Sequence, residues 1–354
     1  MSRRKSKIIK IGNVYIGGNS PIAIQSMAKT KTSDIEKTIR QISSLEKVGC
    51  EIVRLAVKDT ADAGALKKIK QQVNLPLVAD IHFNWRFALV AIDNGVDKIR
   101  LNPGNIYKKN QIREIVSAAK LHKVPIRVGV NSGSLRQSVK AGKTTADMLV
   151  KSALDYIRTL EKFKFYEIVV SLKGTGVFDT IEAYRKIAKL CAYPLHLGVT
   201  ATGPQYLGSI KSSIAIGGLL LEGIGDTIRV SLTDKPETEV KVAKSILESV
   251  AARFFGPQII SCPTCGRCEV DLVKIVKELE KKISTLNHRL CARPLKVAVM
   301  GCVVNGPGEA RGVDIGVAFG KKEGLLFKNG KPLRKVSFSN CADILIKEME
   351  NAGA

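Results

Sequence analysis

Four of the eight cysteines in this chain have a spacing that suits metal or redox chemistry. Cys262, Cys265 and Cys268 lie within one short segment, and Cys302 follows in a second segment. A Cys-x-x-Cys pair is typical of a zinc site, a dithiol redox pair or an iron–sulfur cluster. A zinc ribbon normally needs a second such pair, which the sequence lacks. A thioredoxin-like pair should open a helix within a fold that the rest of the chain does not suggest. An iron–sulfur cluster is therefore the favoured interpretation.

The context of Cys302 suits the same site. This cysteine directly follows the strand-like run Lys296–Met300, and a glycine-rich stretch with Gly306 and Gly308 comes after it. Backbone amides in such a loop can approach cluster sulfides closely. The alternative is that Cys302 is a small buried residue and that Glu309 is a surface charge. In combination with the Cys-x-x-Cys pair, the cluster is preferred.

Eight short apolar runs alternate with eight helical patterns over about 250 residues, which is the size expected of a (β/α)8 barrel. The runs are mostly apolar without strict alternation, which is typical of parallel strands buried on both faces. They are Ile22–Met27, Cys50–Val57, Leu75–Phe83, Lys98–Pro103, Pro125–Asn131, Glu167–Lys173, Pro194–Thr200 and Thr227–Leu232. The helical patterns are Asp34–Val48, Asp62–Gln72, Phe87–Asn94, Gln111–Leu121, Thr145–Lys162, Thr180–Leu190, Ser209–Leu221 and Glu237–Ala252. The order predicts an α/β protein with an N-terminal (β/α)8 TIM-type barrel, and an open doubly wound sheet is the alternative.

Basic residues recur at the ends of the predicted strands, where a barrel carries its active site. Five strands have an Arg or Lys among apolar neighbours: Arg54, Arg100, Arg127, Lys173 and Arg229. Each could form a structural ion pair, but Asp80 is the only obvious carboxylate at the same ends. Several desolvated cations around one mouth need an anion. Guanidinium groups match phosphate oxygens, so a diphosphate is favoured. His82 lies two residues after Asp80 and is interpreted as a substrate contact.

The composition changes near Phe255–Pro257, and this change divides the chain. We expect a substrate-binding barrel over residues 1–255 and a smaller α+β iron–sulfur domain over 256–354. In the second region a helix (Val270–Ile283), a strand (Lys296–Met300) and a terminal helix (Cys341–Glu350) are predicted. The Asn329-Gly330 pair between apolar runs indicates a β-hairpin.

The formal net charge of +25 favours an anionic partner. No basic run is interleaved with aromatic residues, so nucleic-acid binding is not favoured. The longest apolar runs, such as Ile214–Leu221, are too short to span a bilayer, and no apolar signal segment follows the first residues. We expect a cytoplasmic protein without a membrane partner. The competing hypotheses are a zinc-binding basic nucleic-acid module fused to a barrel, and a barrel enzyme with inert cysteines.

Several motifs resemble those of the 4-hydroxy-3-methylbut-2-enyl diphosphate synthase family of the methylerythritol phosphate isoprenoid pathway, in its two-domain bacterial form. The motifs of the second region are Cys262-Pro-Thr-Cys265-Gly-Arg and Gly301-Cys302-Val-Val-Asn305-Gly-Pro-Gly-Glu309-Ala310. Those of the barrel are Ile24-Gln25-Ser26-Met27, Asp80-Ile81-His82-Phe83, Arg100-Leu101-Asn102-Pro103-Gly104-Asn105 and His196-Leu197-Gly198-Val199-Thr200. The resemblance covers essentially the whole chain.

This resemblance implies an iron–sulfur oxidoreductase with one 4Fe-4S cluster per chain. The implied ligands are Cys262, Cys265, Cys302 and Glu309, whereas Cys268 is not a family ligand. The implied reaction is reductive ring opening of 2-C-methyl-D-erythritol 2,4-cyclodiphosphate to 4-hydroxy-3-methylbut-2-enyl diphosphate. Two electrons would come from ferredoxin or flavodoxin through the cluster, where the weakly held Glu309 gives way to a substrate oxygen.

The resemblance also implies a head-to-tail homodimer and a set of site residues. The implied catalytic residues are Glu309, Asp80 and His82. The implied substrate-binding residues are Arg54, Arg100, Asn102, Arg127, Asn131, Ser171, Lys173, Thr200, Arg229 and Ser231. One departure concerns Ala201, which stands where the family usually has Glu after the Thr of its Leu-Gly-x-Thr motif. If that Glu donates a proton in the family, Asp80 and His82 are the nearest replacements here.

Overall fold

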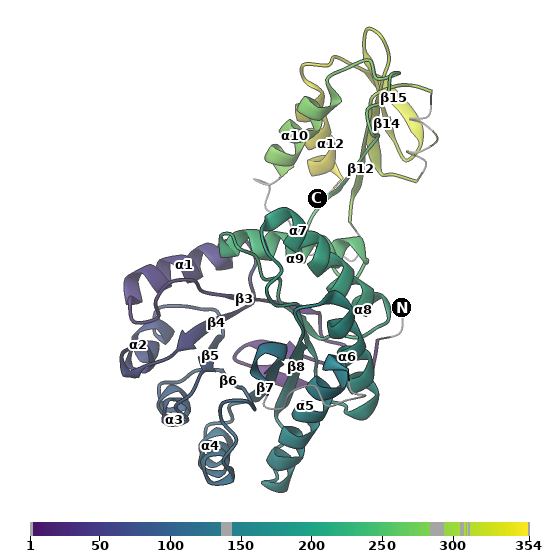
Figure 1. Cartoon of the computed structure of the whole chain (residues 1–354). Coiled ribbons are helices and arrows are strands. Elements are labelled where there is room, and N and C mark those ends of the chain that lie inside the picture. The colour runs from purple at the N-terminus through teal and green to yellow at the C-terminus, as the bar shows by residue number, and fades with distance from the viewer. Residues whose placement is uncertain are drawn as a thin grey trace. The chain divides into compact units, whose positions relative to one another are not determined.

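The computed structural model of the chain describes residues 3–135, 144–283, 294–304, 308, 310 and 312–352. The chain divides into two compact units, Met1–Arg253 and Phe254–Ala354 (Figure 1). No helix among the described residues is both long enough and apolar enough to cross a membrane.

The first unit is an eight-stranded parallel barrel, as predicted. Neighbouring strands follow the order β8-β7-β6-β5-β4-β3-β10-β9, and an isolated parallel bridge between Val170 and Leu195 links the two ends of that order. The strands are β3 (Ala23–Met27), β4 (Ile52–Val57), β5 (Leu77–Ile81), β6 (Lys98–Leu101), β7 (Ile126–Asn131), β8 (Ile168–Lys173), β9 (His196–Leu197) and β10 (Thr227–Ile228). This closure excludes the open doubly wound sheet.

Helices surround the barrel strands on the outside (Figure 1). They are α1 (Ile35–Lys47), α2 (Thr60–Lys70), α3 (Arg86–Asp93), α4 (Lys109–Leu121), α5 (Thr145–Lys162), α6 (Val177–Leu190), α7 (Gln205–Ser212), α8 (Gly218–Leu221) and α9 (Pro236–Ser249). The single helix predicted over Ser209–Leu221 is wrong in detail. A π-helical segment, η2 (Ser213–Gly217), separates α7 from α8, and the helical region begins at Gln205.

An antiparallel hairpin of β1 (Ile9–Ile11) and β2 (Val14–Ile16) precedes the barrel. Its residues Ile9, Ile11 and Ile16 are buried in one apolar cluster with residues from four barrel strands, including Ile52 and Val78. These partners lie at or near the starts of their strands, so the hairpin covers the N-terminal end of the barrel. The hairpin does not cover the opposite end of the barrel, where the basic residues at the strand ends lie and where a ligand could enter.

The second unit is a five-stranded sheet with two helices. The strand order is β11 (Gln258–Ser261), β12 (Lys296–Met300), β13 (Ile315–Phe319), β14 (Gly324–Lys328) and β15 (Lys331–Val336). Strands β11, β12 and β13 are parallel to one another, and β14 is antiparallel to both of its neighbours, β13 and β15. Helices α10 (Leu272–Ile283) and α12 (Cys341–Asn351) share an apolar core with the sheet. The hairpin predicted at Asn329-Gly330 is confirmed, and both residues have positive φ, as a tight β-turn requires.

Candidate functional site

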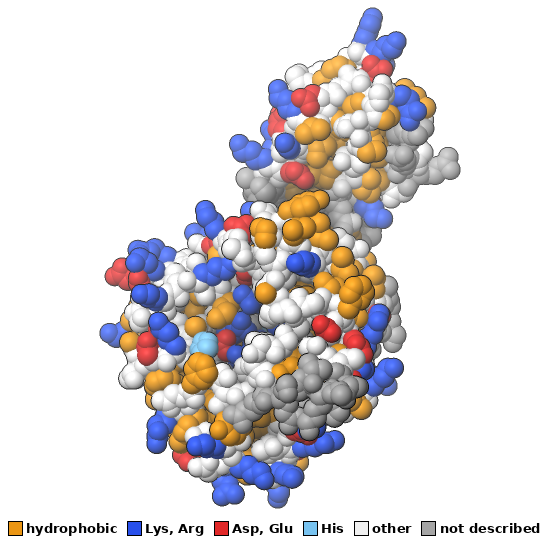
Figure 2. Space-filling model, viewed as in Figure 1, with side chains coloured by type: hydrophobic (Ala, Val, Ile, Leu, Met, Phe, Trp, Pro, Cys, Tyr) orange, Lys and Arg blue, Asp and Glu red, His pale blue; other side chains and the backbone are white. Residues whose placement is uncertain are grey.

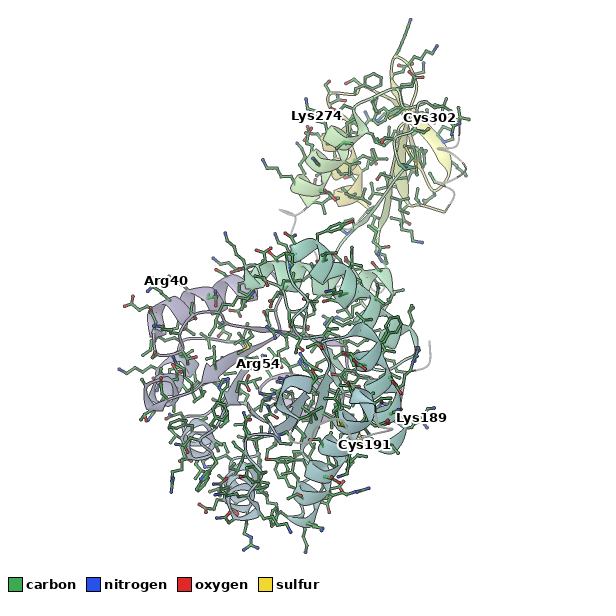
Figure 3. The ribbon with its side chains drawn as sticks, in the orientation of Figure 1. Arg40, Arg54, Lys189, Cys191, Lys274 and Cys302 are labelled. Carbon is green, nitrogen blue, oxygen red and sulfur yellow. The ribbon has the colours of Figure 1, made fainter. Side chains whose placement is uncertain are left out.

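The carboxyl ends of the barrel strands bring the predicted basic residues to one mouth. Asp80 on β5 lies opposite Arg100 on β6, which in turn lies opposite Arg127 on β7. Lys173, at the end of β8, lies opposite Asn131. The face of the first unit seen in Figure 2 is hollowed, with basic and acidic side chains visible inside the hollow. Figure 3 labels Arg54 among the strands.

Asp80 is the charge partner of two buried guanidinium groups. Its Oδ1 lies 3.0 Å from Arg100 Nη1, and its Oδ2 lies 3.4 Å from Arg54 Nε. Burial raises the pKa of the Asp80 carboxyl, but the positive charges of Arg54 and Arg100 outweigh burial and hold that pKa well below its usual range. The backbone leaves room for this arrangement, because a β-carbon at Gly129 would lie only 2.5 Å from Arg100 Nε.

Glu239 is a second buried carboxylate at the mouth, and sequence reasoning missed it. It comes from α9, where a charged residue on an amphipathic helix resembles an ordinary solvated side chain. Its Oε1 lies 3.0 Å from Lys29 Nζ and accepts a hydrogen bond of 2.9 Å from the Leu232 amide, while its Oε2 lies 3.8 Å from Arg229 Nη2. Glu239 therefore positions Arg229.

Several cationic donors at the mouth have no hydrogen-bond partner among the described residues. In the part of the chain that the structure describes, Arg127 Nε and Nη1, Lys173 Nζ, Arg100 Nε and Arg229 Nε are buried without a hydrogen bond. Burial, together with the positive charges of Arg229 and Arg54, lowers the pKa of the Lys173 ammonium well below its usual range. Buried donors without acceptors are unfavourable. Their convergence at one mouth suits an anion with several oxygens.

A deeper layer of polar residues lies within the barrel, and sequence reasoning did not assign it to the site. The fully buried Lys98 Nζ donates to Gln25 Oε1 over 3.4 Å. His196 Nδ1 lies 2.8 Å from Thr227 Oγ1, and burial with the nearby charges of Arg127 lowers the pKa of His196 well below its usual range. This shift favours the neutral imidazole. The sequence feature that could have indicated this layer is Lys98, a lysine within the otherwise apolar strand run Lys98–Pro103.

The two predicted asparagines lie beside the mouth, Asn102 directly after β6 and Asn131 at the end of β7. The Asn102 side-chain oxygen accepts hydrogen bonds from the Gly104 amide at 3.0 Å and from Ser134 Oγ at 3.3 Å. Ser134 Oγ also lies 2.9 Å from the carbonyl oxygen of Asn131. Ser134 thus links the end of β7 to the segment that follows β6.

The remaining predicted residues also lie at strand ends. Ser171 is buried on β8, and Thr200 Oγ1 donates to the Gly174 carbonyl over 3.2 Å. Ser231 Oγ is buried without a partner among the described residues. His82 is partly buried, with its Nδ1 3.4 Å from the Val57 carbonyl oxygen. Ala201 is exposed and has a φ of 53°, so no carboxylate comes from that position.

In the second unit, the cysteines gather at one end of the sheet. Because β11 and β12 are parallel with Ser261 opposite Val299, Cys262 and Cys302 follow adjacent strand ends. The Gly301 amide donates to Cys262 Sγ over 3.2 Å. A β-carbon at Gly301 would lie 2.4 Å from Cys268 Sγ, so Cys268 packs at the same place. Cys265 is exposed, and Cys302 is labelled in Figure 3.

The donor set at this end fits an iron–sulfur cluster by its chemistry, since soft thiolates on a tight turn prefer such clusters or zinc. Within the described ranges, no three His, Cys, Asp or Glu residues are arranged closely enough to hold a metal ion. The predicted ligand Glu309 lies outside the described residues. By contrast, burial raises the pKa of the Cys50 and Cys341 thiols to about 12, as expected of inert packing residues.

Comparisons with known proteins agree over nearly the whole chain. Residues 6–244 match the family described as the GcpE TIM-barrel domain, and residues 258–351 match the GcpE protein C-terminal domain. The 4-hydroxy-3-methylbut-2-en-1-yl diphosphate synthase (flavodoxin) of Fusobacterium nucleatum is 52% identical over 97% of this chain and 96% of that protein. The enzyme of the same name from Clostridium perfringens is 51% identical over 99% of both chains. A Yersinia pestis dihydropteroate synthase structure has 11% identity and a TM-score of 0.51, covers 69% of this chain and 98% of its own, and indicates the barrel fold alone.

Proposed function

Because this chain belongs to the GcpE family of 4-hydroxy-3-methylbut-2-en-1-yl diphosphate synthases, we propose that it catalyses the reductive ring opening of 2-C-methyl-D-erythritol 2,4-cyclodiphosphate to 4-hydroxy-3-methylbut-2-enyl diphosphate. The reaction breaks the bond between a ring carbon and a phosphate oxygen, takes up two electrons and two protons, and releases one water. The donor is a flavodoxin, as the names of the relatives state for those proteins, with ferredoxin as the other candidate.

The observation that carries this proposal is the set of unpartnered cations at the barrel mouth. Arg127 and Lys173 supply buried donors without acceptors among the described residues, and a cyclic diphosphate supplies the missing oxygens. Arg100 and Arg54 are oriented by Asp80, and Arg229 by Glu239. Fixed donors of this kind hold the substrate in one orientation before the chemistry begins. The hydroxyl groups of the substrate and its remaining phosphate oxygens are proposed to contact the polar side chains of Asn102, Asn131, Ser171, Thr200 and Ser231.

Proton delivery is assigned to His82. Asp80 is poorly suited to give up a proton, since the adjacent guanidinium groups hold its pKa well below its usual range. Its role is to orient Arg54 and Arg100. His82 is partly buried beside the mouth, and the exposed Ala201 offers no carboxyl group there.

For the second unit, we propose that Cys262, Cys265, Cys302 and Glu309 hold one 4Fe-4S cluster. Such a cluster supplies single-electron transfer and a Lewis-acidic iron. The thiolates would anchor the cluster, and the more weakly held Glu309 would leave one position exchangeable. The proposal includes a cytoplasmic location and a homodimer.

Anaerobic purification followed by iron, sulfide and zinc assays tests the function. We expect about four irons per chain, as one 4Fe-4S cluster requires, together with conversion of the cyclodiphosphate. A colourless, zinc-containing protein that binds nucleic acid in a salt-sensitive manner would support the alternative zinc module instead. The variant Glu309→Ala should retain iron and lose turnover, and undiminished turnover would remove Glu309 from the site.

A further inference from the structure

We propose that the end of the second unit's sheet that carries the cysteines is also the docking surface for the electron donor, an acidic flavoprotein of the flavodoxin type. The docking patch is formed by Val303, Val304, Lys321 and Lys322. The inference rests on the proposed function and deepens it, because it assigns the donor to a place on this chain.

The topology of the sheet brings these residues together. Strands β11, β12 and β13 are parallel, so the turn after β13 lies at the same end of the sheet as Cys262 and Cys302. That turn connects β13 to β14 and is closed by a 2.9 Å hydrogen bond from the Gly320 amide to the Glu323 carbonyl. A β-carbon at Gly320 would lie 3.9 Å from the side chain of Val303. The lysine turn therefore lies next to the segment that follows Cys302.

The centre of the patch is apolar and exposed. Val303 and Val304 have 53% and 65% of their surface exposed, although both directly follow Cys302 in the sequence. An exposed apolar pair with a polar rim is typical of the centre of a protein interface. Cys265 is also exposed, so the thiol-bearing end of the sheet reaches the surface of the unit.

The rim of the patch is basic. Lys321 and Lys322 are exposed, and neither forms a salt bridge with another residue that the structure describes. The neighbouring Glu323 carboxylate is paired with Lys335, so the turn presents unneutralised positive charge. Such charge steers an acidic protein to the apolar centre and fixes its orientation. A nucleic acid is the poorer fit, since the patch offers no aromatic side chain on which a base could stack.

The proposed partner balances the electrons of the reaction. A flavodoxin hydroquinone gives up one electron and becomes a semiquinone, so two donors are oxidised for each substrate reduced. The two electrons, with two protons, open the ring and release one water. Each turnover therefore needs two docking events, and release of the spent donor must be fast. A small apolar centre with a charged rim suits such a transient complex.

Direct binding of an oxidised bacterial flavodoxin to the full-length protein tests the proposal without requiring turnover. The double variant Lys321→Glu/Lys322→Glu should weaken the Kd at least 10-fold and flatten its dependence on salt. The matched control is Lys331→Glu/Lys347→Glu. Both control lysines are exposed, but they lie at the other end of the sheet, where Lys328 Nζ is 3.9 Å from Glu348. The control should change the Kd less than twofold.

Equal losses in both double variants, an unchanged Kd, or no binding by the unaltered protein would overturn the docking patch. A second readout is turnover with reduced flavodoxin and with reduced methyl viologen. The Lys321→Glu/Lys322→Glu variant should raise the KM for flavodoxin and leave the viologen-driven rate unchanged. Absence of viologen-driven turnover in the unaltered protein would overturn the proposed function, whereas the binding measurement would still decide the docking patch.

Discussion

Asp80 compensates two buried cations, Arg54 and Arg100, and this makes it a main determinant of the stability of the barrel mouth. Replacing it by Asn keeps its size but removes the charge between Arg54 and Arg100. Breaking a buried ion pair by removing one partner lowers the free energy of unfolding by about 3 kcal/mol or more. We expect that loss for Asp80→Asn in denaturant unfolding at neutral pH.

The same variant should show a defined pH dependence. Since the folded-state pKa of Asp80 is depressed, its stabilisation is complete above the unfolded carboxyl pKa of about 4 and declines as pH falls further. The difference between the unaltered protein and Asp80→Asn should therefore shrink below about pH 4. The control is Asp155→Asn, which removes an exposed pair with Lys151 and should change stability by about 0.5 kcal/mol or less. A similar small effect for Asp80→Asn would contradict the assigned role.

Replacing Lys173 should stabilise the free protein and weaken its binding of anions. Its Nζ is buried without an acceptor in the described part of the chain, so Lys173→Met should stabilise the free protein by about 1 kcal/mol. The same change should weaken pyrophosphate binding at least 10-fold, measured by calorimetry. Unchanged pyrophosphate affinity would show that the ammonium does not meet the anion.

At the residue level, the sequence located the mouth because strand ends in a barrel converge. Arg54, Asp80, Arg100, Arg127 and Lys173 could be placed there by counting strands. Other residues at or below the mouth could not be found by counting strands. Glu239 reaches the mouth from a helix, and His196 and Lys98 belong to a deeper layer whose contacts depend on the closure of the barrel.

At the scale of elements, glycines determine where the strands can carry long cationic side chains. A β-carbon at Gly198, just after β9, would lie 2.6 Å from the Arg229 carbonyl oxygen and 2.7 Å from Lys173 Nζ. Gly198→Ala should therefore displace Lys173 and lower the free energy of unfolding by about 2 kcal/mol, within the range for overpacking. It should also weaken pyrophosphate binding.

The matched control is Gly64→Ala in the middle of α2. Nothing lies within 4 Å of a β-carbon there, so the change should stabilise the protein by up to about 1 kcal/mol through helix propensity. Thermal unfolding of both variants measures the contrast. If Gly198→Ala leaves the free energy of unfolding unchanged, the segment after β9 adapts to the added methyl group without disturbing the mouth.

Periodicity predicted the long elements well and the short ones poorly. The range predicted for α5, Thr145–Lys162, agrees with the structure, and its length gives a strong helical pattern. The last two barrel strands are only two residues long, too short for a pattern to define their ends. The β1–β2 hairpin has three-residue strands, too few for an alternation to be recognised.

At the scale of the whole molecule, each unit has a core of its own. The second unit packs both helices against its sheet through residues such as Leu279, Val299 and Leu345. Removing the cluster by chelation should therefore increase amide exchange around Cys262 and along β11 and β12, with β3 to β8 unchanged. Hydrogen exchange of cluster-loaded and stripped protein measures this. Equal deprotection of the barrel strands would contradict independent cores.

The depressed pKa of Lys173 makes anion binding and proton binding one linked equilibrium. Burial and the neighbouring arginines lower the pKa of the Lys173 ammonium in the free protein, whereas a bound diphosphate raises that pKa again. Between the two pKa values a proton is taken up with the anion, and affinity falls as pH rises through the free-state pKa. The heat of pyrophosphate binding then depends on the ionisation enthalpy of the buffer. The anion and the proton on Lys173 thus strengthen each other's binding at the mouth.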